Sequence, residues 1–206
     1  MSNENFELNN YPNLIAIPYK KTLNEKDPQR KDHQRMCLEM MLSFNASVCL
    51  ANYYHYKTAE EGKDAKISQA LPDLPSDPKL HFDLGMMSIG KWNQITRDTA
   101  SVLFDATSKG KDNDFLVADI GSMYRNKGSV WNKNVNNLIS LRNQDAHGQI
   151  ISDEALEGEL KNRQKMVDQL MKEMSFYANY KLIVPIDDEV KEGVLVHICK
   201  DLSGSG

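Results

Sequence analysis

A helical spacing of apolar residues runs through most of residues 28–180 and limits this chain to a narrow set of folds. Within about 28–57, apolar side chains recur at steps of three and four, which is the period of an amphipathic α-helix. This segment follows Asp27-Pro28, in which aspartate is a favourable N-cap and proline suits the first helical turn. The same spacing predicts further helices at about 88–105, 114–125, 131–147 and 152–180. The sequence therefore predicts an all-α fold, a bundle of four or five helices.

The two ends of the chain depart from this period. The apolar run at residues 14–17 lies between Pro12 and Pro18, and two prolines so close argue against a helix. Residues 1–27 are therefore expected to form an extended N-terminal arm. Residues 181–186 and 194–198 have strand composition and predict a short β-hairpin within 181–206. Because the last four residues, Ser-Gly-Ser-Gly, have linker composition, we expect this segment to lead to an absent downstream domain.

The composition is that of a cytoplasmic protein without a membrane-spanning segment. No apolar run reaches the roughly 18 residues that a transmembrane helix needs, and the acidic, asparagine-rich N-terminus does not resemble a secretory signal. The chain has three cysteines, and Cys37 and Cys49 lie on one predicted helix, too far apart to form a disulfide. The net charge of −4 argues against a general coating of nucleic acid but allows a local basic site.

Motifs typical of metal and nucleotide sites are missing from the sequence. There is no CxxC, HxxxH or HExxH spacing for zinc, and no glycine-rich phosphate loop of the GxxxxGKS/T or GxGxxG type. Neighbouring acids such as Asp187-Asp188 are typical of solvated surfaces. We therefore expect neither a cofactor nor a metal ion.

One segment, residues 138–148, combines residue types that suit phosphodiester chemistry. At 100° per residue, Arg142 falls in the same sector of its helix as Val135 and Leu138, where an unpaired guanidinium is costly. Asn143 and His147 form an i, i+4 pair on the adjoining polar flank. His147 falls in the last predicted turn, where the negative end of the helix favours a protonated imidazole.

The surroundings of this segment are basic and rich in amides. Residues 120–144 include no acid and four cations, Arg125, Lys127, Lys133 and Arg142. The same span holds six asparagines, at positions 126, 132, 134, 136, 137 and 143. Such a strip could bind phosphates, and Trp131 could stack on a base. The predicted RNA-binding residues are therefore Arg125, Lys127, Trp131 and Lys133.

The segment Arg142-Asn143-x-x-x-His147 resembles the arginine, polar residue, histidine motif of HEPN domains. The resemblance implies a helical bundle over residues 28–180, with the arm and the hairpin outside it. It implies a metal-independent endoribonuclease of a defence or toxin type, acting on single-stranded RNA. It also implies that the chain is the N-terminal domain of a larger bacterial protein.

The resemblance further implies a composite active site at the interface of a homodimer. Each protomer would contribute catalytic residues Arg142, Asn143 and His147 to one cleft. His147 would act as general acid or base, Arg142 would stabilise the charge of the transition state, and Asn143 would orient the substrate or the histidine. The products would carry 2′,3′-cyclic phosphate ends.

Two other interpretations stay open at the level of sequence. The chain could be a non-catalytic helical dimerisation or sensor module of a larger effector, with Arg142 a buried structural arginine that pairs with an acid from another helix. It could also be an antitoxin-like protein that binds a protein partner through its methionine-rich first long helix. The exposure of Arg142 and His147 in a common cleft would distinguish a catalytic site from a structural one.

Overall fold

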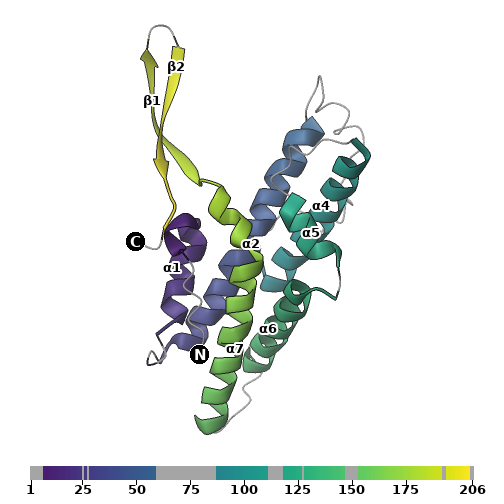
Figure 1. The fold of residues 1–206 in the computed structure, drawn as a ribbon, viewed down its shortest axis with the longest axis vertical. Helices are drawn as coiled ribbons and strands as arrows, with labels where there is room; N and C mark the ends of the chain where they lie inside the picture. Colours follow the sequence, from purple (N-terminus) through teal and green to yellow (C-terminus); the bar gives the residue numbers. More distant parts are fainter. Residues whose placement is uncertain are drawn as a thin grey trace.

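The computed structural model describes residues 7–24, 26, 28–58, 87–110, 118–126, 128–146, 153–191 and 194–204. These residues form six α-helices and a C-terminal antiparallel hairpin, which confirms the all-α fold class with a terminal hairpin (Figure 1). None of the described helices combines the length and the apolarity that a membrane crossing needs.

The helices pack around α2, the longest of them. The α-helices are α1 (Asn13–Thr22), α2 (Arg30–Thr58), α4 (Ile89–Gly110), α5 (Ala118–Arg125), α6 (Val130–Ala146) and α7 (Asp153–Glu173). Two short 3-10 helices, η1 (Leu8–Asn10) and η3 (Ser175–Asn179), precede α1 and follow α7. Helix α2 contacts α1, α4, α6 and α7, while α5 packs on α4 and α6 runs along α7 (Figure 1).

The extended arm predicted for residues 1–27 is wrong for residues 13–22, which form α1 with Pro18 inside the helix. Proline in a helix interior removes one backbone hydrogen bond and costs about 3 kcal/mol. The inner face of α1 offsets this cost, because Ile15, Ala16 and Tyr19 are buried in the same core as α2. The Tyr19 hydroxyl also donates a hydrogen bond to Asp168 Oδ1 on α7, at 2.9 Å. Tertiary packing therefore overrides the local effect of the proline.

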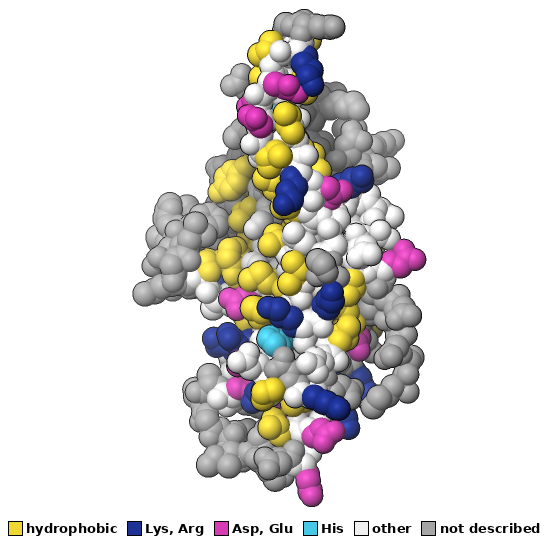
Figure 2. Space-filling model, turned by 90° about the vertical axis from the view of Figure 1, so that its left-hand side faces the viewer, with side chains coloured by type: hydrophobic (Ala, Val, Ile, Leu, Met, Phe, Trp, Pro, Cys, Tyr) yellow, Lys and Arg dark blue, Asp and Glu magenta, His cyan; other side chains and the backbone are white. Residues whose placement is uncertain are grey.

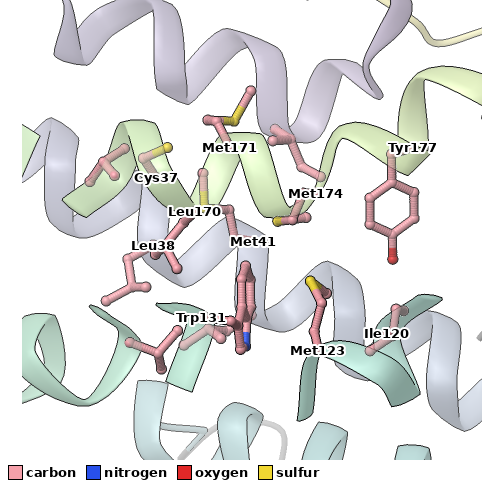
Figure 3. Packing of buried hydrophobic residues seen from close by; sticks show 14 of the residues in the cluster. Cys37, Leu38, Met41, Ile120, Met123, Trp131, Leu170, Met171, Met174 and Tyr177 are labelled. Atoms are coloured by element: carbon pink, nitrogen blue, oxygen red, sulfur yellow. The ribbon is translucent and has the colours of Figure 1, made fainter. Parts of the chain in front are cut away.

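A single hydrophobic core lies between α1, α2 and α7 on one side and α4, α5 and α6 on the other. Methionines fill much of it, and Figure 3 shows Met41, Met123, Met171 and Met174 among its labelled side chains. Methionine has three rotatable bonds and fills irregular gaps between helices. The core therefore accounts for much of the methionine content.

The hairpin consists of β1 (Ile183–Lys191) and β2 (Val194–Asp201), paired from Lys191↔Val194 at the turn to Ile183↔Asp201 at the base. The pairing shifts register between Pro185 and Asp187. Both strands extend further than predicted, because Asp187–Lys191 continue β1 and Cys199–Asp201 continue β2. The hairpin projects from the end of the bundle at which α7 ends (Figure 1).

The base of the hairpin is tied to the start of α1. The backbone N–H of Asn13 donates to the carbonyl of Leu202 at 2.7 Å, and that of Gly204 donates to the carbonyl of Tyr11 at 2.8 Å. Gly204 is buried with φ +104°, a conformation that favours glycine. The linker character predicted for this end therefore does not hold for Ser203 and Gly204, which pack against the N-terminal segment.

Two of the three cysteines lie in the core. Because they are buried, we predict that the free energy of unfolding falls at alkaline pH. Desolvation raises the pKa of Cys49 to about 12 and holds the pKa of Cys37 far above its usual value. Above about pH 8.5 the unfolded chain loses thiol protons that the folded chain keeps, so the free energy of unfolding falls as pH rises. Between about pH 8.5 and 9.5, we expect the free energy of unfolding to fall by up to about 1.4 kcal/mol per pH unit for each of the two buried thiols.

Urea unfolding at a series of pH values measures this effect. The double variant Cys37→Ala/Cys49→Ala will have a lower starting stability but a shallower slope against pH. The variant Cys199→Ala is the control, because Cys199 is exposed and its removal will leave the slope unchanged. A wild-type stability that stays constant over this range would contradict the prediction.

Candidate functional site

Helix α6 carries the Arg142-Asn143 pair, and its start is fixed by local hydrogen bonds. Ser129 caps the helix, because its Oγ accepts a hydrogen bond from the backbone N–H of Asn132 at 3.2 Å. The Asn132 side chain donates to the carbonyl of Asn126 at 2.8 Å, and Asn126 Oδ1 accepts from the N–H of Gly128 at 2.9 Å. These asparagines therefore serve the turn between α5 and α6.

Trp131 lies on the buried face of α6, so its predicted role in stacking on a base is wrong. Its side chain is fully buried, and its ring packs edge-on against Tyr124, with centroids 5.8 Å apart. Figure 3 shows it among Leu38, Met41 and Met123. The reason is the position of Trp131 four residues before Val135 and seven before Leu138, both of which are buried.

The opposite face of α6 is exposed and polar. Besides Val130, its exposed residues over 130–144 are four amides, one hydroxyl and one lysine, without an acid: Lys133, Asn136, Asn137, Ser140, Asn143 and Gln144. Of the other predicted RNA-binding residues, Arg125 is exposed at the end of α5, and Lys127 lies outside the described residues. Asn134 is buried and donates to Gln169 Oε1 at 2.7 Å, so only part of the asparagine-rich strip faces solvent.

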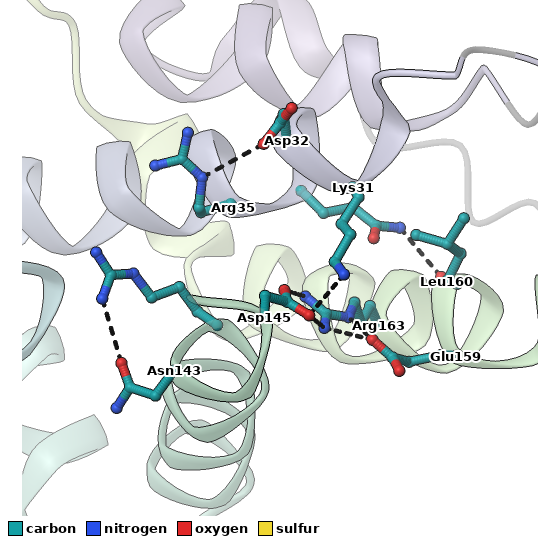
Figure 4. Close-up of polar contacts among 10 residues, drawn as sticks. Lys31, Asp32, Arg35, Asn143, Asp145, Glu159, Leu160 and Arg163 are labelled. Atoms are coloured by element: carbon teal, nitrogen blue, oxygen red, sulfur yellow. Dashed lines mark hydrogen bonds and ion pairs between the residues drawn. The ribbon is translucent and has the colours of Figure 1, made fainter. Parts of the chain in front are cut away.

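Arg142 and Asn143 lie together at the last turn of α6. Arg142 is half-buried, Asn143 is exposed, and Arg142 Nη1 donates to Asn143 Oδ1 at 3.3 Å (Figure 4). No ion pair involves Arg142 within the described part of the chain. His147, the third residue of the motif, lies outside the described residues, so a common cleft with Arg142 stays a prediction.

The buried arginine that pairs with acids from its own and another helix is Arg163. Its side chain is only 3% exposed. Its Nη1 and Nη2 atoms each lie 2.9 Å from an oxygen of Asp145 on α6, and its Nε donates to Glu159 Oε1 at 2.7 Å (Figure 4). The Lys31 Nζ atom on α2 is 2.6 Å from Asp145 Oδ1. We call Lys31, Asp145, Glu159 and Arg163 the Asp145 cluster.

The Asp145 cluster is a part of the site that our sequence reasoning missed, although the signal was present. Arg163 stands three residues after Leu160 and four before Val167, in the middle of the apolar stripe of α7. The same argument that singled out Arg142 applies to it, since an unpaired buried guanidinium is costly. Glu159 lies four residues before Arg163 on the same helix, a spacing that by itself predicts an ion pair between the two side chains.

The Asp145 cluster holds the end of α6 in place, with the Arg142-Asn143 pair on the outside. Asp145 belongs to the Arg-Asn-x-x-x-His segment, two residues before His147, and is bonded to both α2 and α7. An arginine beside such an anchored turn offers a permanent positive charge and several donors to a phosphate. Among the described residues, no three His, Cys, Asp or Glu side chains are grouped to hold a metal ion.

Comparison with family models, with curated proteins and with solved structures finds no match to this chain. The candidate site is therefore defined by two observations. One is the geometry of α6 and the Asp145 cluster, and the other is the resemblance of the Arg142-Asn143-x-x-x-His147 segment to the HEPN motif. These observations concern one protomer.

Proposed function

We propose that this protein is a metal-independent RNA endonuclease of a defence or toxin type, with an active site shared between two protomers. The observation that supports this most is the position of Arg142 and Asn143. They lie at the surface of α6 on a turn that the Asp145 cluster anchors to α2 and α7. Catalytic groups need such support from the surrounding residues, because small displacements weaken their effect.

The proposed chemistry uses a proton carrier and a fixed cation. One His147 removes the proton from the 2′-hydroxyl, whose oxygen attacks phosphorus, and a protonated His147 of the partner gives a proton to the leaving 5′-oxygen. Arg142 stabilises the negative charge that builds on the phosphate oxygens. Asn143 holds the Arg142 side chain through the hydrogen bond at 3.3 Å. The products are a 2′,3′-cyclic phosphate and a 5′-hydroxyl.

A shared site follows from the spacing of the motif. In a helix that continued from α6 through residue 147, Arg142 and His147, five positions apart, would leave it about 140° apart and about 7.5 Å apart along the axis. With that spacing, one protomer would be poorly arranged to grip a single phosphate with both side chains. A two-fold axis beside α6 would bring the arginine of one copy to the histidine of the other.

The test is cleavage of labelled single-stranded RNA in the presence of EDTA. We expect wild type to cut, and Arg142→Ala and His147→Ala each to cut at least about 100-fold more slowly. The control variant Arg97→Ala removes an exposed arginine from α4 and will cut like wild type. Because a heterodimer of the two defective variants keeps one Arg142 and one His147 in the shared cleft, we expect an equimolar mixture refolded together to cut faster than either variant alone, although more slowly than wild type.

Two results would contradict this proposal. One is equal cleavage by wild type and His147→Ala, and the other is cleavage that EDTA abolishes. If the refolded mixture cut no faster than either variant alone while wild type was active, the result would be consistent with a nuclease but would contradict the shared site.

The second candidate is a non-catalytic helical dimerisation or sensor module. The observation that favours it is the projecting hairpin, whose apolar side chains are exposed among the described residues. Wild-type protein that never cuts RNA, although it is folded and self-associates, would support this candidate over the nuclease.

A further inference from the structure

The hairpin exposes more large apolar side chains than any other element that the structure describes. They lie on both strands: Ile183, Val184, Ile186, Val190, Val194, Leu195 and Ile198. Figure 2 shows hydrophobic side chains along the hairpin, at the top of the view, with charged side chains between them. A two-stranded hairpin alone is only marginally stable in water, and such exposed apolar surface commonly marks an interaction site.

The two edges of the hairpin differ in their ability to accept another strand. The β1 edge carries Pro185, a register shift at the next residue, and the acidic run 187–189. Proline, bulges and charges are the features with which natural sheets prevent pairing at an edge. Over residues 194–199, β2 has the sequence VLVHIC, without proline, irregularity or acid. Among the described residues, no other segment pairs with this outer edge of β2.

We propose that a second copy of this chain binds at the β2 edge, so that two hairpins form one four-stranded antiparallel sheet. The strand order is β1–β2–β2–β1, with a two-fold axis between the two β2 strands. Each β2 contributes Val194, Val196 and Ile198 to one face of the sheet, because alternate residues share a face. These side chains become cross-strand neighbours of the same residues in the partner, which stabilises the pair.

The distribution of charge along the hairpin supports this arrangement. The base of the hairpin has a charge of +1, from Lys181, Lys200 and Asp201. Residues 187–191, in the half nearest the turn, have a charge of −2, from Asp187, Asp188, Glu189 and Lys191. An antiparallel pairing of two β2 strands sets the basic base of one hairpin beside the acidic half of the other. Full overlap of two β1 strands would place Asp187 of one copy opposite Asp187 of the other at the two-fold axis, with Asp188 and Glu189 close by, which is unfavourable.

The same features limit each hairpin sheet to two copies. In the four-stranded sheet both outer strands are β1, and their proline, register shift and acids oppose the addition of further strands. Pairing of identical edges about a two-fold axis is closed, whereas pairing of β1 with β2 would continue without end.

This contact is separate from the proposed nuclease site. The hairpin follows the end of α7 (Figure 1), whereas Asp145, three residues after Arg142 on α6, pairs with Arg163 in the first half of α7. The contact can therefore form whether or not Arg142 and His147 cut RNA. Its test measures association alone.

Sedimentation of matched double variants tests which edge is used. The variant Val194→Lys/Ile198→Lys places two lysines on β2, and Ile186→Lys/Val190→Lys makes the same two exchanges on β1. Ile186, Val190 and Val194 are at least 62% exposed and Ile198 is 37% exposed, and none of the four belongs to the buried core. We expect the β2 variant to raise the dimer Kd at least about tenfold through like-charge contacts, and the β1 variant to dimerise like wild type.

Cysteine scanning gives a second readout that does not depend on weakening the dimer. In a Cys199→Ser background, single cysteines at positions 195–198 are oxidised and compared with single cysteines at 187–190. Residues that face their own copy across an antiparallel axis have Cα atoms about 4.5–5.5 Å apart, within the range of a disulfide. We expect covalent dimers at one or two adjacent β2 positions and at none on β1.

Each other outcome would overturn the proposal. A monomeric wild type at about 100 µM, well above the Kd of a specific interface, would exclude the dimer. Equal weakening by both double variants would indicate packing of hairpin faces. A dimer that neither variant weakens, or disulfides that form on β1, would assign the contact to another surface.

Discussion

Replacing Arg163 with alanine is expected to lower the free energy of unfolding by about 3 kcal/mol. Its guanidinium is almost completely buried and bonded to Asp145 and Glu159. Removing it leaves two carboxylates without their main partner in a partly buried place, and such an uncompensated charge is strongly destabilising. We place the effect at the lower end of the usual range because both acids retain some contact with water.

Urea unfolding, followed by circular dichroism at pH 7, measures this loss as a lower midpoint at an unchanged slope. Lys161→Ala is the matched control on the same helix. Lys161 pairs with Glu157 at 2.6 Å but on the surface, so its loss should cost less than about 0.5 kcal/mol. If Arg163→Ala were no more destabilising than Lys161→Ala, the Asp145 cluster would not anchor α6.

The second large effect is expected from Trp131→Ala, at about 4 kcal/mol of lost stability. The indole is fully buried between α6 and the helices around it, and its removal leaves a cavity that the neighbouring side chains fill only in part. The variant Trp131→Phe keeps most of the volume and should lose less. Thermal or urea unfolding of both variants provides the measurement.

Trp131 also separates a structural role from a role in RNA binding. Base stacking would make RNA affinity depend on the indole, whereas a core residue affects RNA only through folding. If the protein binds RNA as proposed, we therefore expect folded Trp131→Leu, which keeps an apolar side chain but cannot stack on a base, to bind RNA like wild type. Lys133→Ala, two residues away on the exposed face, should leave stability within about 0.5 kcal/mol of wild type. A stable Trp131→Ala protein with weakened RNA binding would contradict the buried placement.

Local sequence patterns predicted most of the helices and the C-terminal hairpin. The apolar spacing predicts a helix over 131–147, and α6 runs from Val130 to Ala146. The strand composition after residue 181 predicts a hairpin, and β1 and β2 form one. These features depend on near neighbours in the chain, because the period of apolar residues matches the repeat of the element itself.

Tertiary structure decided what local patterns could not. Residues 13–22 become a helix in spite of Pro18, because the apolar side chains on one face of this helix are buried in the same core as those of α2 and α7. The sequence predicts Trp131 at the surface, in a basic strip. In the structure α6 packs with this side chain toward the core, so Trp131 is buried.

For the candidate site, too, the sequence alone revealed one part and the tertiary structure decided the other. The segment that holds Arg142, Asn143 and His147 is visible in the sequence, since its spacing lies within one helix. The partners of Asp145 come from residues 31 and 163, and a periodic pattern does not reveal which distant residue will face it. The sequence by itself therefore determined most of the helices and the hairpin, whereas only the packing of distant segments decided that residues 13–22 become a helix and which polar groups meet. The physical reason is that helical periodicity depends on neighbours within one turn, whereas the pairing of a buried charge depends on helices that come together only in the folded chain.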